Sequence, residues 1–272
     1  MGLLYNRTTH RTLEQQLTEV GMRVSPETFY YKLEQNGEQV GVASSAIDTS
    51  KIRVQAADLV RGRFPIGKDT LRVEVRSEAR FTRGMRLRDF IIRADGDVNP
   101  FLLRGVVQEG EDKTLRLTIE SKGARPITQE SIAQAPVFIP TVAPLPLMLT
   151  RAPKTGDSVR VALFDPVSRE LKNVTLRIQS DSLFLITDSA TFDSTSNRWV
   201  KARQDSLRGW RITDRKSPIT AWVDAAGRLI AASEPGGVTL TRTAFEIAFA
   251  NWNLDEKQRA APRRGTETQK KP

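Results

Sequence analysis

The spacing of apolar residues along the chain changes near residue 28. Before this point, Leu13, Leu17 and Val20 recur at the interval of three to four residues that is typical of an amphipathic helix. The sequence therefore predicts a short helix over residues 8–22, within a lead-in of residues 1–27. From Thr28 onward apolar residues recur at every second position, which is the period of a strand with one buried face.

The first predicted hairpin turns at Asn36 and Gly37. This dipeptide favours a type I′ turn, because both central residues of that turn need a positive φ. The flanking strands are expected at residues 28–35 and 40–47. Segments with the same two-residue period follow at residues 52–60, 71–81, 87–94, 101–108 and 115–119.

A proline-rich segment, residues 136–156, joins two halves of strand pattern at residues 28–135 and 157–242. Its most apolar residues are Leu145, Leu147, Met148 and Leu149. Proline is tolerated in a first helical turn, so a short helix opening at Pro144 is expected here. Two interpretations remain open: a core plug or crossover between the two halves, or the lid or wall of an apolar cavity.

The second half repeats the strand pattern and ends in a helix. Its predicted strands are residues 159–164, 174–178, 183–186, 199–202, 210–213, 220–223, 229–232 and 238–241. Residues 244–252 have helical spacing and predict a short C-terminal helix. Residues 253–272 lack this periodicity and are polar and basic, so we expect them to form a disordered tail.

These patterns predict a mainly β fold, a long antiparallel meander curved into an open or half-closed barrel. The single β domain would cover residues 28–252, with short helices at the two ends and the proline-rich apolar segment at its centre. Helices do not alternate with strands, so a parallel βαβ architecture is excluded.

The formal net charge is +10, and half of this excess lies near the C-terminus. Residues 257–272 contain six basic residues and one acidic residue, a net charge of +5. The remaining excess is spread over strands in which charges of both signs alternate, so nucleic acid is not an expected partner. We expect residues 257–272 to make a peripheral contact with an anionic membrane surface instead.

The residue types needed for most hydrolytic mechanisms are missing. The chain has no cysteine and one histidine, His10, which leaves no thiolate nucleophile and no Cys- or His-rich metal site. The segment from Gly62 to Lys68 has the glycine and lysine spacing of a phosphate-binding loop. However, Pro65 removes a backbone N–H, and Asp69 stands where Ser or Thr should hold magnesium. We therefore expect no enzymatic activity, no cofactor and no metal site in this chain.

The sequence points instead to binding through apolar surface. A curved sheet would gather the apolar residues of the proline-rich segment and two tryptophans on its concave face. The predicted ligand-binding residues are Leu145, Leu147, Met148, Leu149, Trp210 and Trp222. The expected partner is an apolar or lipid-like ligand, with a segment of an envelope protein as the alternative.

Three segments carry a resemblance to a group of bacterial envelope domains. They are YYKLEQNGEQVG at residues 30–41, LFDP at residues 163–166 and AWVDAAGR at residues 221–228. The chain resembles half-barrels of the lipoprotein-carrier type, and related segments precede transglutaminase-like domains in some envelope proteins. This resemblance implies a non-catalytic binding or accessory domain in the periplasm or cell envelope.

The alternatives concern the context of the domain. The alternative function is that of an accessory domain in a larger transglutaminase-like or peptidase protein whose catalytic part is absent from this chain. No signal peptide is visible at the start of the sequence, so the cytoplasm is the alternative location.

Overall fold

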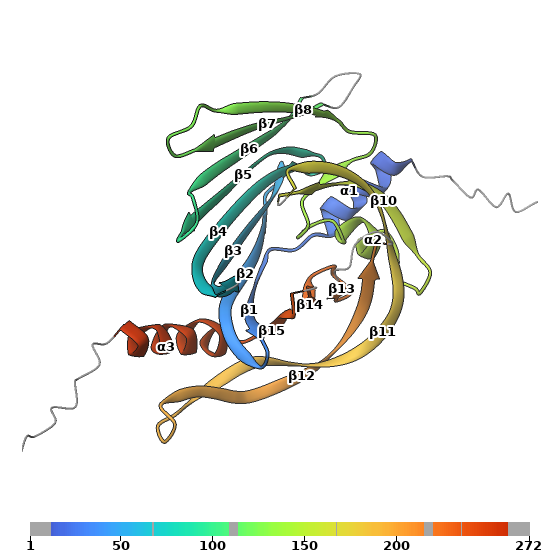
Figure 1. Ribbon diagram of the computed structural model, residues 1–272. Helices are drawn as coiled ribbons and strands as arrows, with labels where there is room; N and C mark the ends of the chain where they lie inside the picture. The colour runs from blue at the N-terminus through green and yellow to red at the C-terminus, as the bar shows by residue number, and fades with distance from the viewer. Residues whose placement is uncertain are drawn as a thin grey trace, which may run out of the picture.

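The computed structural model describes residues 12–66, 68–108, 114–166, 168–214, 220–234 and 236–260. Its strands form one 15-stranded sheet that curves round a filled interior and is not closed by hydrogen bonds (Figure 1). All neighbouring strands are antiparallel except the short pair β9 and β10. The prediction of a mainly β, open or half-closed barrel is confirmed.

The first half of the chain contains eight strands among the described residues. They are β1 (Glu27–Gln35), β2 (Glu38–Thr49), β3 (Arg53–Ile66), β4 (Asp69–Thr82), β5 (Leu87–Gly96), β6 (Phe101–Gln108), β7 (Thr114–Ser121) and β8 (Ile127–Ile132). The turn between β1 and β2 has φ values of 53° at Asn36 and 82° at Gly37, as the type I′ prediction requires.

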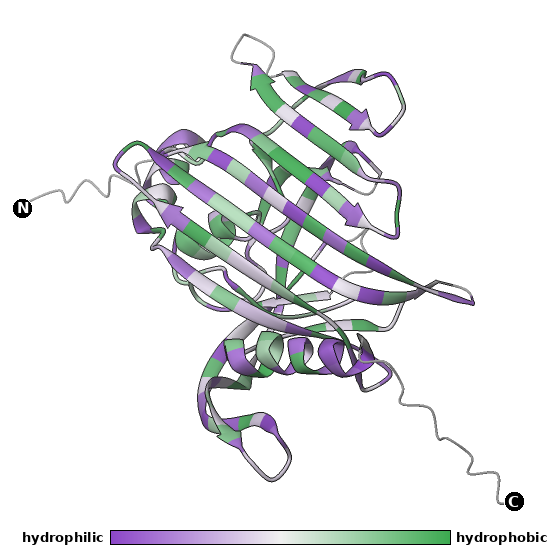
Figure 2. Cartoon of the chain, turned by 90° about the vertical axis from the view of Figure 1, so that its left-hand side faces the viewer, coloured by the Kyte–Doolittle hydropathy of each residue, from purple (hydrophilic) through white to green (hydrophobic). Residues whose placement is uncertain are grey.

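The second half contains the remaining strands and returns to the first. They are β9 (Val137–Phe138), β10 (Ser158–Asp165), β11 (Glu170–Asp193), β12 (Arg198–Thr213), β13 (Thr220–Val223), β14 (Leu229–Ser233) and β15 (Val238–Thr243). Strands β11 and β12 each unite two segments that were predicted as separate strands. Figure 2 shows hydrophobic and hydrophilic residues alternating along many strands, which gives the sheet one apolar and one polar face.

The order of the strands explains why the sheet curves back on itself. The chain begins in the middle of the sheet at β1, runs outward to the edge strand β8, crosses to the opposite edge at β9, and returns until β15 pairs with β1. Only four residues separate Ile132 of β8 from Val137 of β9, so the two edges are held within about 18 Å of each other. The covalent chain therefore bridges the gap that hydrogen bonds leave open. Neither β8 nor β9 was predicted from the sequence.

Strand β10 is covered on both of its faces. Val161 and Phe164 point to opposite faces, three residues apart, yet they are 1% and 0% exposed. Phe164 packs on Phe90 of β5, with 4.7 Å between the ring centroids. Strand β10, which lies next to the edge strand β9, therefore packs against a strand of the first half.

Two helices fill one end of the interior. Helix α1 (Leu13–Arg23) begins after Thr12, which forms a capping box with Gln15. Helix α2 (Leu145–Leu149) lies against α1, and Arg23 Nη1 donates to the Leu149 carbonyl oxygen at 2.6 Å. The first helix was predicted to include Thr12, but this residue is the N-cap that precedes the helix, and the prediction was wrong at this position. Residues 8–11 lie outside the described part of the chain.

The C-terminal helical region packs on the outside of the sheet. It consists of a π-helical segment, η1 (Glu246–Ala250), followed by α3 (Asn251–Ala260). Trp252 and Ala248 are buried against Val42 of β2. No helix among the described residues is both long and apolar enough to span a bilayer.

The predicted boundary between helix and tail at residue 253 was wrong, because α3 continues to Ala260. Glu256 forms an ion pair with Arg63 of β3 at 2.6 Å, and Asp255 forms one with Arg198 of β12 at 2.7 Å. These contacts hold a polar segment that cannot be recognised as helical from apolar spacing. Residues 261–272 lie outside the described part.

Candidate functional site

The predicted ligand-binding residues lie mainly in the packed core. Leu145, Leu147 and Met148 are 0%, 5% and 2% exposed, and Leu149 packs against the same cluster. Trp210 is buried in this core, whereas Trp222 packs edge-on against Phe184 at 5.0 Å on the other face of the sheet. The structure does not bring the six residues together round a cavity. The proline-rich segment fills the interior, which corresponds to the core-plug interpretation.

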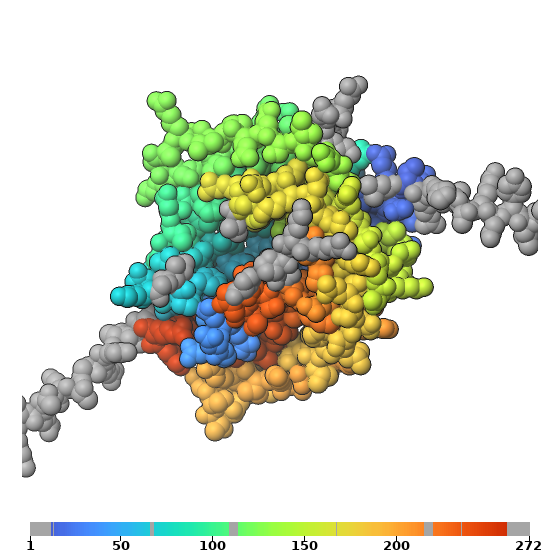
Figure 3. Space-filling model, turned by 45° about the vertical axis from the view of Figure 1, so that its right-hand side comes forward, coloured from blue at the N-terminus to red at the C-terminus, as the bar shows by residue number. Residues whose placement is uncertain are grey.

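A different set of apolar residues lines the other end of the concave face. Tyr31, Leu33 and Ala43 are buried there, and the side chains packed round them are only half-buried. We call this set the inner apolar surface: Phe29, Val40, Val60, Phe64, Leu229, Val238 and Leu240. Neither α1 nor α2 contributes to it. Figure 3 shows the molecule hollowed between the cyan strands β3 and β4 and the yellow start of β11.

A buried ion pair lies beside this surface. Arg242 Nη1 is 2.9 Å from Asp224 Oδ2, and both side chains are at most 10% exposed. The Arg242 guanidinium also donates to the Leu229 carbonyl oxygen and lies 3.9 Å from the centre of the Phe29 ring. Tyr31 donates to the same carbonyl at 3.2 Å, and burial raises the pKa of its hydroxyl above the ordinary range.

Arg228 adds a second buried cation near this pair. Its backbone N–H donates to Asp224 Oδ1 at 2.9 Å, and its Nη2 donates to the Ser25 carbonyl oxygen at 2.7 Å. Its Nε and Nη1 are enclosed without a hydrogen-bond partner among the described residues. Burial lowers the pKa of Arg228, and the negative charges of Glu27 and Asp224 oppose this effect.

Asp58 joins the sheet to the proline-rich segment. Its Oδ2 accepts hydrogen bonds from Ser77 of β4 at 3.0 Å and from Thr141 at 2.6 Å. Its Oδ1 is enclosed and has no partner among the described residues. Burial raises the pKa of Asp58, and hydrogen bonds from Thr141, Ser45 and Ser77 partly offset the increase.

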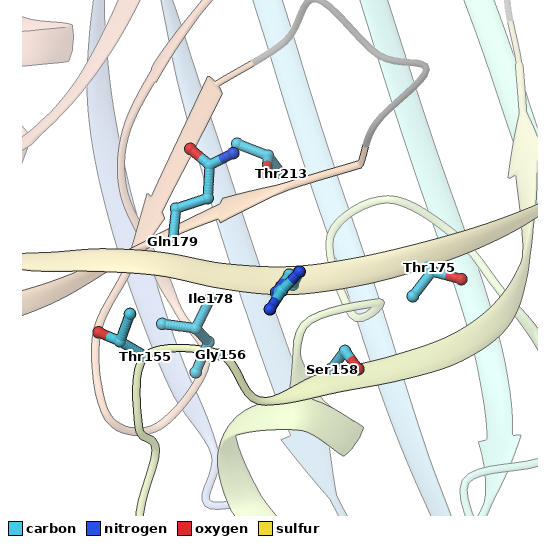
Figure 4. Close-up of a pocket in the computed structure, with 8 residues that line it drawn as sticks. Thr155, Gly156, Ser158, Thr175, Ile178, Gln179 and Thr213 are labelled. Carbon is cyan, nitrogen blue, oxygen red and sulfur yellow. The ribbon is translucent and has the colours of Figure 1, made fainter.

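A polar groove of about 730 Å³ lies on β10, β11 and the end of β12 (Figure 4). Its lining residues are Thr155, Gly156, Ser158, Thr175, Arg177, Ile178, Gln179 and Thr213. The strand register places Ser158 beside Arg177 and Arg177 beside Thr213, so these three residues form one row across the strands. None of the six residues predicted from the sequence lines this groove.

Both the inner apolar surface and the polar groove were missed by the sequence analysis. The residues of the inner apolar surface come from strands far apart in the chain, and only the pairing of β1 with β15 brings them together. In the sequence, the groove residues look like those of an ordinary solvent-exposed strand face. In both cases, the residues that form the site can be recognised only from the pairing of neighbouring strands.

The acidic side chains of the interior were also considered as possible metal ligands or catalytic groups. No group of three Asp, Glu or His side chains within the described ranges could hold a metal ion. His10 lies outside these ranges. Hydroxyl groups donate hydrogen bonds to Asp58 and partly offset the effect of burial on its pKa, and the Asp224 carboxylate is paired with Arg242.

The fold and these surfaces define a barrel-like, mainly β domain. No protein-family model matches the sequence, and no curated protein matches it. Among solved structures, the chain is similar to a beta-barrel-like protein of the domain of unknown function DUF1849 from Brucella abortus. The identity is 12% and the TM-score 0.49, over 81% of this chain and 96% of that one.

The chain is also similar to a DUF1089 family protein from Pseudomonas aeruginosa. Here the identity is 12% and the TM-score 0.35, over 72% of this chain and 90% of the other. The first neighbour is described as beta-barrel-like and of unknown function, and both likenesses are too distant to carry a functional argument.

Proposed function

We propose that this chain is a non-catalytic binding domain of the bacterial cell envelope that holds an apolar, lipid-like ligand on its inner apolar surface. One observation carries the proposal: seven inward-facing apolar side chains gather in the concavity and stay half-buried. Apolar surface that is collected in a concave region and left partly exposed is typical of ligand sites. The proposal keeps the concave face that was predicted from the sequence but assigns different residues to the ligand site.

The groups next to this surface support an amphiphilic ligand. Arg242 contacts Phe29, a member of the inner apolar surface, and hydrogen-bonds to the backbone of Leu229, another member. Binding sites for small molecules commonly combine an apolar lining with a few fixed polar groups that orient the ligand. The buried ion pair would serve this purpose at the edge of the apolar region.

The envelope location and the membrane contact belong to the same proposal. The location is supported by the resemblance of residues 30–41, 163–166 and 221–228 to envelope half-barrels. The membrane contact is supported by the basic residues from Lys257 onward, of which Lys257 and Arg259 lie on the last turn of α3. An accessory role in a larger transglutaminase-like or peptidase protein would place a protein segment on the same surface.

The proposal is tested on protein purified under native conditions. Lipid extraction and mass spectrometry should identify a co-purifying apolar molecule, and a fluorescent fatty acid should bind saturably. Val60→Ser and Leu240→Ser should weaken this binding. Val106→Ser, on an apolar residue of β6 that is 49% exposed and lies outside the inner apolar surface, should leave it unchanged.

Two results would overturn the proposal. One is protein without any extractable apolar molecule that also fails to bind the fatty acid. The other is equal loss of binding in all three variants. A defined peptide segment that competes with the fatty acid, and whose own binding is weakened by Val60→Ser, would identify a protein as the occupant instead.

A further inference from the structure

The geometry points to a second binding site, in the polar groove, for a phosphate group carried by a larger molecule. This site is separate from the inner apolar surface and does not depend on the function proposed above. Among its lining residues Arg177 alone is charged, and the other polar side chains are hydroxyls and one amide. A volume of about 730 Å³ lies within the range of organic ligand sites, so the groove has room for more than a free phosphate ion.

The strand register makes the row of polar groups a fixed feature. Ser158, Arg177 and Thr213 are direct neighbours on three adjacent strands, and Thr175 lies two residues from Arg177 on the same face of β11. Side chains on one face of adjacent strands stand about 5 Å apart, which suits several contacts to one tetrahedral anion. The groove thus offers a guanidinium flanked by hydroxyl donors.

The wall of the groove at Gly156 is held by backbone hydrogen bonds. Gly156 N donates to the Ile178 carbonyl oxygen at 2.9 Å, and Ile178 N donates to the Asp157 carbonyl oxygen at 3.0 Å. Thr155 and Gly156 are thereby fixed relative to β11 (Figure 4). A ligand would enter a largely preformed site and would not have to order this turn.

The charges near the groove favour an anion. No carboxylate is among its lining residues, and no described residue forms an ion pair or hydrogen bond with Arg177. The nearby Asp157 carboxylate is engaged by Arg151 and by the backbone N–H of Lys154. Arg160 pairs with Thr175 on the same strand face and adds a further positive charge.

The surroundings of Arg177 differ from those of the paired arginines elsewhere in the sheet. On β3 and β4, Arg61 pairs with Glu74 at 2.7 Å, and Arg80 pairs with Asp89 of β5 at 2.6 Å. Arg177 has no such partner, although it lies in a concave and hydroxyl-lined place. Arginine binds phosphate through paired N–H donors, and these charge-assisted bonds are stronger than neutral ones.

Calorimetric titration of the full chain at low salt tests this site. The probes are inorganic phosphate, glycerol 3-phosphate and vesicles of phosphatidylcholine with and without phosphatidic acid. Wild-type protein should bind at least one phosphate probe. Tighter binding of glycerol 3-phosphate identifies a small-molecule source of the phosphate, and selective binding of phosphatidic acid vesicles identifies a lipid headgroup.

Arg177→Gln should weaken the binding about tenfold or more, because it removes the charged donor. Thr213→Val, which keeps the shape and strand preference of the side chain, should weaken it less. Arg88→Gln is the matched control, because Arg88 is also an exposed strand arginine without an ion pair among the described residues. Equal loss in the Arg177 and Arg88 variants, or no binding by folded wild-type protein, would overturn the inference.

Discussion

Asn251 holds both backbone polar groups of Trp199. The Trp199 N–H donates to Asn251 Oδ1 at 2.9 Å, and Asn251 Nδ2 donates to the Trp199 carbonyl oxygen at 2.9 Å. One side-chain amide thus replaces a neighbouring strand near the tip of the long β11–β12 hairpin, 52 residues away in the sequence. Because Asn251 is the first residue of α3, this pair docks the hairpin onto the helix.

We expect Asn251→Ala to lower the free energy of unfolding by about 1–3 kcal/mol. The substitution leaves a backbone donor and an acceptor without partners in a place where Asn251 is only 6% exposed. Hydrogen exchange near Trp199 should become faster, and chemical denaturation measures the loss of stability. Asn253→Ala, on an exposed position of the same helix, should change stability by less than about 0.5 kcal/mol. Similar effects of both substitutions would contradict the docking role of Asn251.

The ion pair between Arg242 and Asp224 leads to a second prediction. Arg242→Gln should cost about 3–5 kcal/mol, because it leaves the Asp224 carboxylate buried without its cation. The double variant Arg242→Gln with Asp224→Asn should be less destabilised than the sum of the single variants. Arg208→Gln, at an exposed pair with Asp181, should cost about 0–1 kcal/mol. Additive effects at Arg242 and Asp224 in urea denaturation would show that the pair is not coupled.

The sequence predicted the strands well, because a strand with one buried face has a two-residue period that needs no tertiary information. The turn at Asn36 and Gly37 is set by local backbone preference and was also found. Strand β8 was missed, since five of its six residues are exposed and no alternation marks it. Helix α3 was missed beyond residue 252 for a related reason: ion pairs to distant strands hold it, and such pairs leave no periodic pattern.

The polar groove was not predicted from the sequence at all, and for the other site only a concave apolar face could be expected, without its residues. A concave apolar face follows from a curved sheet with alternating strands, and that part of the prediction agrees with the inner apolar surface. The individual residues could not be chosen, because Leu145 and Phe64 are both apolar in the sequence. Only the fold shows that Leu145 is enclosed in the core cluster that also contains residues of α1, while Phe64 stays half-buried in the inner apolar surface.

The basic residues after α3 give a third prediction. Truncation after Ala260 removes residues 261–272, whose sequence carries a net charge of +3, and keeps the contacts of Glu256 and Trp252. The free energy of unfolding should not change, while binding to anionic vesicles should weaken, most clearly at low salt. Vesicle co-sedimentation at several salt concentrations measures this effect. Unchanged vesicle binding by the truncated chain would rule out a membrane contact through these residues.

The last prediction concerns Asp58 and pH. Burial raises the pKa of Asp58 in the folded protein above its value in the unfolded chain, so the folded state binds this proton more tightly. Stability contributed by the protonated form is then present below the unfolded pKa of about 4 and is lost as the pH rises through the folded pKa. The Asp58→Asn variant has no titrating group at position 58 and avoids this loss. The free energy of unfolding of the wild type minus that of Asp58→Asn should therefore fall between the unfolded and the folded pKa of Asp58 and stay constant at higher pH. Asp97→Asn is the control of opposite sign, since the hydrogen bonds from Arg72 lower the pKa of Asp97 and its contribution is lost as the pH falls. Urea denaturation of the three proteins over this pH range measures both differences, and a difference for Asp58 that rises with pH would contradict the burial of its charge.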